Sequence, residues 1–379
     1  MKRIRRSRKR EADEEMNGAE MTGPEKELQD LYEKLISGSG SSEERNLKLW
    51  DTIYDLAAEI AAMEPWVGYQ MYMPIMLELR IHGEKIAVSF EKSPFAKTGK
   101  TIALYHGEKG LCDLDVLSFR DPVVPREFVV YDRDAYLLCW GSRQDVPEEN
   151  RQILKALGRS FRGDGNWLYF ASAASRTVPR TLRDDEAEIV MEALVELRTA
   201  IRDHLQKKIA VNYDDGYCLS RYFDEKLHRM VTGPVPYVEP QMSFRSYNFN
   251  DEVMARRIKR AKQNDRVVDF DFFYNGWSPT GHMDENGNIG NWQFAIAYDE
   301  VSGNINLMMP VEMDVSTGEM AFLMLHDYVM EYGRMKELIV RNAEVYAALE
   351  AVCSKVGIPL GLDTMPQVDR LLNEIRSGI

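Results

Sequence analysis

From residue 267 to its end, the chain carries an ordered series of strand and helix signals that strongly restricts its fold. Strand-like runs are separated by polar turns, and helices are marked by caps such as the S-x-x-E box from Ser316 to Glu319 and the N-cap residue Asn342. In chain order, the predicted elements are strands at 267–274, 294–298 and 305–309, a helix at 316–333, a strand at 337–340, a helix at 342–355, a strand at 358–362 and a helix from 366. This order predicts a mixed sheet flanked by helices.

The order resembles the ribonuclease-H-like fold, and the integrase core in particular. The resemblance implies that active members hold two divalent ions with carboxylates on the first strand, at the end of the fourth strand and on a late helix. Two ions about 3.5–4 Å apart stabilise the attacking and leaving oxygens of phosphoryl transfer. In this chain, Asp269 or Asp271 matches the first position, and Asp369 or Glu374 can supply the third.

The second carboxylate position is altered, because the fourth strand ends in Arg341 and Asn342. A protonated guanidinium beside two magnesium ions is electrostatically adverse, and Asn342 already serves as a helix cap. Asp269 and Asp271 also alternate with apolar residues, as expected for a strand with one exposed face. We therefore predict a structural role for the two aspartates, and no metal or cofactor. The alternative is a metal-dependent nuclease or phosphotransferase that uses them with Glu374 in a rearranged centre.

A second candidate site is the glycine-rich run F-R-G-D-G-N-W at 161–167. Such turns can present several backbone N–H groups to an anion, and arginines lie close by. The candidate anion-binding residues are Arg159, Arg162, Gly163, Gly165 and Asn166. The competing interpretation, which we favour, is a helix-to-strand turn whose aromatic residues pack into the core.

Other catalytic motifs are incomplete. The run A-K-T-G-K-T at 96–101 lacks the first glycine of a phosphate-binding loop and precedes a strand-like run, so a surface hairpin turn is favoured. The chain has no G-x-S-x-G elbow and no H-E-x-x-H pattern. A non-catalytic protein is therefore favoured over an enzyme.

Residues 44–206 are predicted to form an N-terminal α+β domain. Five apolar residues recur at spacings of four and three, which indicates one face of a helix: Leu49, Ile53, Leu56, Ile60 and Met63. Several strands follow, H-G-E-K-G at 106–110 is interpreted as a turn, and a long helix is predicted at 184–206. A hairpin and connector in 207–245 are grouped with the C-terminal domain, giving a domain at 207–379 and a fold class that combines α+β and α/β.

Residues 1–43 are predicted to be a disordered tail that ends in a Gly/Ser linker. Its first ten residues carry seven positive charges, whereas the whole chain has a formal net charge of -13. Because an acidic body repels phosphate backbones, nucleic acid is expected to bind only through this tail, if at all. A nucleic-acid-associated factor acting through the tail is therefore a second alternative function.

The remaining composition predicts a cytoplasmic protein. The four cysteines are widely spaced and no Cys/His cluster has zinc spacing, which favours reduced, mostly buried thiols. No apolar run reaches the length needed to span a bilayer, so no membrane partner is expected. A protein partner fits these features, but the sequence does not identify one.

Two sets of motifs also resemble a family of bacterial two-domain proteins of unknown function. The first domain of that family carries the L-W-x-x-I-Y-x-L-A-x-E-I-x-x-M-x-P-W and L-G-x-x-F-R-G-x-x-x-W motifs, here at 49–66 and 157–167. The second carries I-V-R-N-A-E-type, G-I-x-L and P-x-x-D-x-L motifs, here at 339–349, 356–360 and 366–371. The resemblance implies a two-domain arrangement without an acidic triad, in agreement with a pseudoenzyme that serves as a binding or interaction module.

Overall fold

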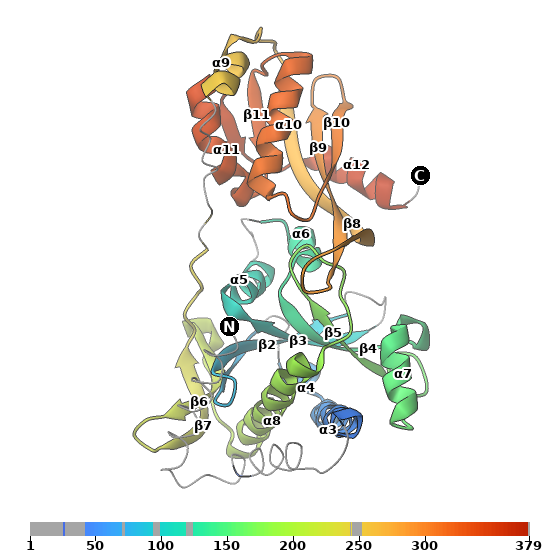
Figure 1. Cartoon of the computed structure of the whole chain (residues 1–379). Helices are drawn as coiled ribbons and strands as arrows, with labels where there is room; N and C mark the ends of the chain where they lie inside the picture. The colour runs from blue at the N-terminus through green and yellow to red at the C-terminus, as the bar shows by residue number, and fades with distance from the viewer. Residues whose placement is uncertain are drawn as a thin grey trace. The chain divides into compact units, whose positions relative to one another are not determined.

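The computed structural model describes residues 26, 42–69, 73–93, 99–118, 124–242, 244 and 252–377. The predicted tail at 1–43 lies almost entirely outside these described residues. The chain divides into two units, each of which contains one mixed sheet (Figure 1). Unit 1 comprises 1–118, 134–173 and 179–240, and unit 2 comprises 119–133, 174–178 and 241–379.

Unit 1 is built on a seven-stranded sheet with the order β5-β4-β3-β2-β1-β6-β7. Neighbouring strands are antiparallel except for β1 and β6, which are parallel. The strands are β1 (Ile75–Leu79), β2 (Glu84–Lys92), β3 (Lys100–His106), β4 (Ala135–Gly141), β5 (Trp167–Ala173), β6 (Tyr217–Asp224) and β7 (Arg229–Pro236). Because β3 is a strand paired with β2, Lys100 does not open a helix, as a phosphate-binding loop would require, and residues 94–98 before it lie outside the described residues.

The helices of unit 1 bury aromatic and aliphatic side chains against this sheet. They are α3 (Ser42–Ala62), α4 (Pro65–Gly68), α5 (Gly107–Ser118), α7 (Glu148–Ala156) and α8 (Asp184–Lys207). Trp50 and Tyr54 of α3 contact Phe170 of β5 edge-to-face, with ring centroids 5.9 and 4.9 Å apart. Four of the five residues of the predicted apolar face, Leu49, Ile53, Leu56 and Ile60, are buried, and the fifth, Met63, follows the end of α3 and is half-buried.

One predicted turn was wrong, because H-G-E-K-G begins α5 instead of ending in a hairpin. Gly107 adopts a left-handed φ of 68°, which turns the chain at the end of β3. Gly110 then lies so close to the carbonyl oxygen of Asp134 that a Cβ atom would come within 2.6 Å of it. The glycines that suggested a turn are therefore needed for a tight helix start and a close backbone approach.

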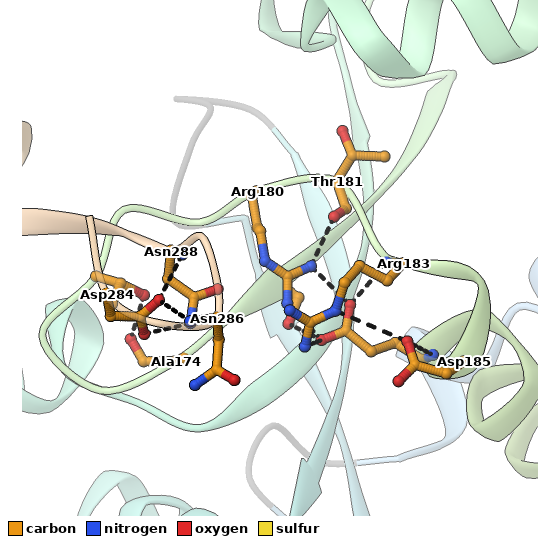
Figure 2. Close-up of polar contacts among 11 residues, drawn as sticks. Ala174, Arg180, Thr181, Arg183, Asp185, Asp284, Asn286 and Asn288 are labelled. Carbon is orange, nitrogen blue, oxygen red and sulfur yellow. Dashed lines mark hydrogen bonds and ion pairs between the residues drawn. The ribbon is translucent and has the colours of Figure 1, made fainter.

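The start of α8 is organised around the buried carboxylate of Glu186. This carboxylate accepts hydrogen bonds from Arg180 Nη1 at 2.7 Å and Nη2 at 2.6 Å, and from the backbone N–H of Arg183 at 2.7 Å (Figure 2). Burial opposes ionisation, but the hydrogen bonds from Arg180 and Arg183 outweigh it and lower the pKa of Glu186. The network holds the chain in place where it leaves β5 and enters α8.

The hairpin predicted in 207–245 is present as β6 and β7, but it belongs to the sheet of unit 1. β6 pairs in parallel with β1, with Leu219 opposite Ile75. The predicted C-terminal domain starts at residue 207 and includes this hairpin, so the structure differs from the predicted boundary. The two paired strands are more than a hundred residues apart in the chain, and local sequence patterns do not predict such long-range pairing.

Unit 2 contains a five-stranded sheet with the order β10-β9-β8-β11-β12. β8, β11 and β12 run parallel to one another, and β9 is antiparallel to both of its neighbours. The strands are β8 (Val267–Met283), β9 (Ile289–Asp299), β10 (Asn304–Val311), β11 (Glu337–Val340) and β12 (Leu360–Leu362). Asp284 closes the β8–β9 turn by accepting hydrogen bonds from the backbone N–H groups of Asn286 and Asn288 (Figure 2).

The helices of unit 2 are α6 (Arg126–Tyr131), α9 (Glu252–Arg260), α10 (Thr317–Tyr332), α11 (Ala343–Val356) and α12 (Pro366–Ser377). Ser316 caps α10 and Asn342 caps α11, as predicted, through hydrogen bonds from the backbone N–H groups of Glu319 at 3.1 Å and Glu344 at 2.9 Å. The predicted order of strands and helices from residue 267 onward is therefore confirmed.

Two short segments from the first half of the chain complete unit 2. From α6, the ring of Phe128 packs 5.3 Å from the ring of Tyr274 on β8. From the segment 174–178, the guanidinium of Arg176 donates to Gln293 Oε1 at 3.2 Å and to the carbonyl oxygen of Glu312 at 2.8 Å. Asp132 ties the two segments together, because its carboxylate accepts a hydrogen bond from the backbone N–H of Arg176.

The burial of β8 corrects a second prediction. We expected one exposed face, but every residue from Val268 to Tyr274 is buried. The apolar face packs on α10, where Phe270 contacts Tyr328. The opposite face carries Asp269 and Asp271, each 1 % exposed. Two carboxylates are therefore held inside the protein, where each requires a physical explanation.

Candidate functional site

The candidate site lies on the face of β8 that carries the two buried aspartates. In the parallel pairing of β8 and β11, Ile339 lies opposite Asp269. Side chains two residues apart share a face of a strand, so the next position, Arg341, comes level with Asp271. The register of two neighbouring strands thus brings a cation beside the second aspartate.

Arg341 forms ion pairs with two carboxylates at once. Its Nε and Nη2 atoms donate to Asp271 Oδ1 at 3.0 Å and Oδ2 at 2.6 Å. Its third nitrogen, Nη1, donates to Asp369 in the first turn of α12. The guanidinium therefore fills the space between the strand carboxylate and the helix carboxylate, with its own side chain only 18 % exposed.

Burial and charge act in opposite directions on this pair. Burial raises the pKa of Asp271, and the adjacent charge of Arg341 opposes that rise. For Arg341, burial favours the neutral form, but Asp271 and Asp369 outweigh it and raise its pKa further above its ordinary value. Arg341 is therefore a permanent cation, and its two-bond geometry with Asp271 is of the strong, directional type.

Asp269 has a different environment. Both of its carboxylate oxygens are buried and have no hydrogen-bond partner among the described residues. Burial, followed by the nearby charges of Glu300 and Asp271, raises the pKa of Asp269 to about 7. This carboxyl group therefore titrates near neutral pH, whereas an ordinary aspartate titrates at a much lower pH.

The predicted site residues are only partly brought together. Asp271 and Arg341 are in direct contact, and Asp269 lies two positions along the same face of β8. Asn342 accepts the backbone N–H of Glu344 through its Oδ1 atom, in the capping role that we expected. Glu374 is exposed on α12, and the carboxylate that α12 contributes to the ion pair is that of Asp369. The P-x-x-D start of α12 was the sequence signal for Asp369, because it puts an acidic residue in the first helical turn.

The arrangement fits a cation supplied by the protein better than a bound metal ion. Within the described part of the chain, no group of three or more His, Cys, Asp or Glu side chains is placed to hold a metal ion. Hard divalent ions need several oxygen ligands around them. Three of the oxygens that could serve, both of Asp271 and Oδ1 of Asp369, already accept hydrogen bonds from Arg341.

The second candidate, the glycine-rich turn, connects α7 and β5. Arg159 is committed to α3, because its guanidinium donates to Asp51 Oδ1 at 2.7 Å and to Asp55 Oδ1 at 2.6 Å. Asn166 donates to the carbonyl oxygen of Arg162 at 3.0 Å and closes the turn on itself. Gly163 and Gly165 in this turn have φ values of 83° and 79°, which glycine adopts readily.

The aromatic residues that flank this turn pack as the competing interpretation expects. The ring of Phe161 lies 6.2 Å from that of Trp167 and 6.3 Å from that of Tyr54. Packing and hydrogen bonds within the chain thus explain the conformation of this turn without a bound anion. Its role as an anion site stays a prediction.

Comparisons with known proteins agree with a two-domain chain. Residues 50–221 match a family model described as "Domain of unknown function (DUF7309)", and residues 254–376 match one described as "Domain of unknown function (DUF6930)". No curated protein matches the chain. The first family match includes residues 124–133 and 174–178, which in this structure pack in unit 2.

Among solved structures, one match is a chain of the simian T-cell lymphotropic virus intasome in complex with PP2A regulatory subunit B56 gamma. It has 18% sequence identity and a TM-score of 0.22, and the match covers 32% of this chain and 42% of that chain. The chain thus spans less than half of the length of this structural neighbour. Among the described helices, none combines the length and the apolar character needed to cross a membrane.

Proposed function

We propose that the chain is a cytoplasmic bacterial protein whose second unit is a non-catalytic binding or interaction module. The observation that carries this proposal is the position of Arg341, whose guanidinium bonds both Asp271 and Asp369. The guanidinium supplies the positive charge that these carboxylates would otherwise take from a divalent ion. A metal ion in the same space would be repelled by the positive charge of Arg341 and would find the space occupied by its guanidinium. Both effects argue against a two-metal centre.

The second candidate function is a metal-dependent nuclease or phosphotransferase with a rearranged acidic centre. One observation favours it, since both oxygens of the buried Asp269 lack a hydrogen-bond partner among the described residues. Unpaired buried polar atoms mark places where an ion, a water molecule or a proton is required. In this reading, Arg341 would have to move away from Asp271 before a metal ion could bind.

A third candidate is nucleic-acid binding through the basic residues at 1–10, which lie outside the described residues. Deletion of residues 1–12 should then abolish salt-sensitive binding.

Thermal unfolding with and without millimolar Mg²⁺ or Mn²⁺ separates the first two candidates. A ligand that binds only the native state stabilises it by about 2.7 kcal/mol at a hundredfold excess over Kd. We expect neither ion to raise the Tm of the wild type, and no cleavage of DNA or RNA in the presence of Mn²⁺. A metal-dependent rise in the wild type that is lost in an Asp269→Asn/Asp271→Asn variant would put the nuclease first.

A further inference from the structure

The exposed face of α9 in unit 2 carries an unusual concentration of positive charge. Five basic residues lie within seven positions, all of them exposed, and we call them the α9 basic face: Arg256, Arg257, Lys259, Arg260 and Lys262. Between Glu252 and Lys262, the only acidic residue is Glu252 itself. This segment is therefore strongly cationic in a chain whose net charge is -13.

The packing of α9 fixes which side faces the solvent. Ala255 and Ile258 are buried, and the helix lies beside α11 and α10 (Figure 1). With 100° between successive residues, Arg256, Arg257 and Arg260 lie within about 50° of the direction opposite the buried residues, and Lys259 lies on the flank of the helix. They are spread over about 6 Å of the helix axis. The positive charge is thus presented outward as one continuous surface.

Among the described residues, these cations have no ion-pair partners within the protein. Among the described residues, none of the five side chains of the α9 basic face forms a salt bridge, whereas Glu252 pairs with Lys355 at 2.5 Å. Ion pairs within the chain commit other arginines, for example Arg159, Arg180 and Arg341. A group of neighbouring cations without counter-charges repel one another, so a polyanion that neutralises them together gains binding energy.

Stabilisation of the helix end does not explain the charge fully. Cations in a last helical turn interact favourably with the terminal carbonyl groups. In this structure, Arg334 takes that role, because its Nη1 atom donates to the carbonyl oxygens of Lys259 at 3.1 Å and Val356 at 3.2 Å. The side chains of the α9 basic face therefore remain available to the solvent.

We propose that the α9 basic face binds the phosphate backbone of a nucleic acid. Three of its five residues are arginines, whose planar guanidinium groups match phosphate oxygens in pairs. Protein–protein interfaces are depleted in lysine at their centres and carry an apolar core, whereas protein–nucleic acid interfaces are strongly positive. Apart from Val253, the outward side of α9 offers no large apolar residue, which favours the nucleic acid over an acidic protein.

This surface is separate from the ion pair of Arg341, and the inference does not depend on the proposed loss of catalysis. It departs from our expectation that nucleic acid would bind only through the tail. Contacts to phosphate carry no base information, so the binding is independent of sequence and depends steeply on salt.

The test measures binding of the full chain to a labelled 20-base-pair DNA and a labelled 20-nucleotide RNA at several salt concentrations. A variant with Arg256→Gln, Arg257→Gln and Arg260→Gln removes three charges and keeps good helix formers. The matched control removes three exposed charges from unit 1: Lys85→Gln, Arg202→Gln and Lys208→Gln. A circular-dichroism melt verifies that both variants fold like the wild type.

We expect the α9 variant to bind about 10- to 1000-fold more weakly at low salt, with a log–log salt slope less steep by about 2 to 3. The control and a chain without residues 1–12 should keep most of the affinity. The proposal is overturned if the wild type binds neither nucleic acid, or if the α9 variant binds like the wild type. It is also overturned if a polyglutamate peptide binds the wild type while both nucleic acids do not. Retention of DNA alone or RNA alone identifies which backbone is the ligand.

Discussion

Arg341 and Asp271 are joined across neighbouring parallel strands by two hydrogen bonds, Nε to Oδ1 at 3.0 Å and Nη2 to Oδ2 at 2.6 Å. Asp271 is 1 % exposed, so its charge depends on this one cation. The third donor of the guanidinium reaches Asp369 on α12, and the pair therefore links β8, β11 and α12.

Removal of Arg341 should destabilise the protein strongly. An Arg341→Met variant leaves Asp271 buried without its cation, and loss of one partner of a buried pair costs about 3–5 kcal/mol. An Arg341→Met/Asp271→Leu variant removes both charges and should recover most of that loss. Urea denaturation monitored by fluorescence gives the two free energies of unfolding. If the double variant is no more stable than Arg341→Met, Asp271 is not held in place mainly by Arg341.

Asp269 should make the stability of the protein depend on pH between about 4 and 7. Its pKa is about 7 in the folded state, compared with the ordinary aspartate value of 3.8 that applies to the unfolded chain. The folded protein therefore binds this proton more tightly than the unfolded chain does. Stability therefore falls as pH rises through this window, by on the order of 2–4 kcal/mol. An Asp269→Asn variant has no proton to lose, so it should melt higher than the wild type at pH 7.5 and equally at pH 4.

The comparison at two pH values is its own control, because a change in packing would alter both melting temperatures equally. A lower Tm of Asp269→Asn than of the wild type at pH 7.5 would contradict the prediction and point to a bound cation at this carboxylate.

The contribution of Glu186 to stability should depend on pH in the opposite direction to that of Asp269. Its pKa is lowered in the folded state, so its contribution is fully present above the ordinary pKa and is lost as pH falls through the folded value. A Glu186→Gln variant loses two charge-assisted interactions with Arg180 and Arg183, at a cost of about 1–3 kcal/mol at pH 7. Thermal melts from pH 7 to pH 3 should show this difference shrinking toward zero.

The matched control is Glu225→Gln, which removes an exposed carboxylate from the same unit. It should change stability by less than about 0.5 kcal/mol at any pH. A Glu186→Gln variant that melts like this control at pH 7 would show that the start of α8 does not need the carboxylate.

A fragment that begins at residue 241 should not fold cooperatively. It lacks α6 and the segment 174–178, which cover Tyr274 and bond Gln293 in the intact chain. Without them, large aromatic surface and backbone carbonyl groups of unit 2 lose their partners. Urea denaturation and the near-ultraviolet circular dichroism of the fragment provide the measurement. A sharp transition at the same denaturant midpoint as unit 2 in the full chain would contradict this dependence.

Full-length Arg176→Ala provides a milder version of the same test. The substitution removes the guanidinium that donates to Gln293, Glu312 and Val315 while the rest of the segment stays in place. We expect a loss of about 2–3 kcal/mol, because several hydrogen bonds from one charged group disappear together.

Local signals in the sequence were enough to predict the strands and helices of unit 2. Polar turns and alternating apolar residues indicate the strands, and the caps Ser316 and Asn342 indicate where helices begin, because each of these signals acts over a few residues. The absence of a carboxylate at the end of β11 was also visible, since it needed only the element order and the identity of Arg341.

Which of these residues meet, and which are buried, depends on the packing of segments in three dimensions. The same period-two pattern fits an exposed face and a face covered by another helix, so the burial of Asp269 and Asp271 was not predictable from β8 alone. The choice of Asp369 over Glu374 depends on how α12 is docked. Likewise, β6 lies beside β1, and residues 174–178 pack in unit 2. Both placements depend on packing and hydrogen bonds between segments that are distant in the chain.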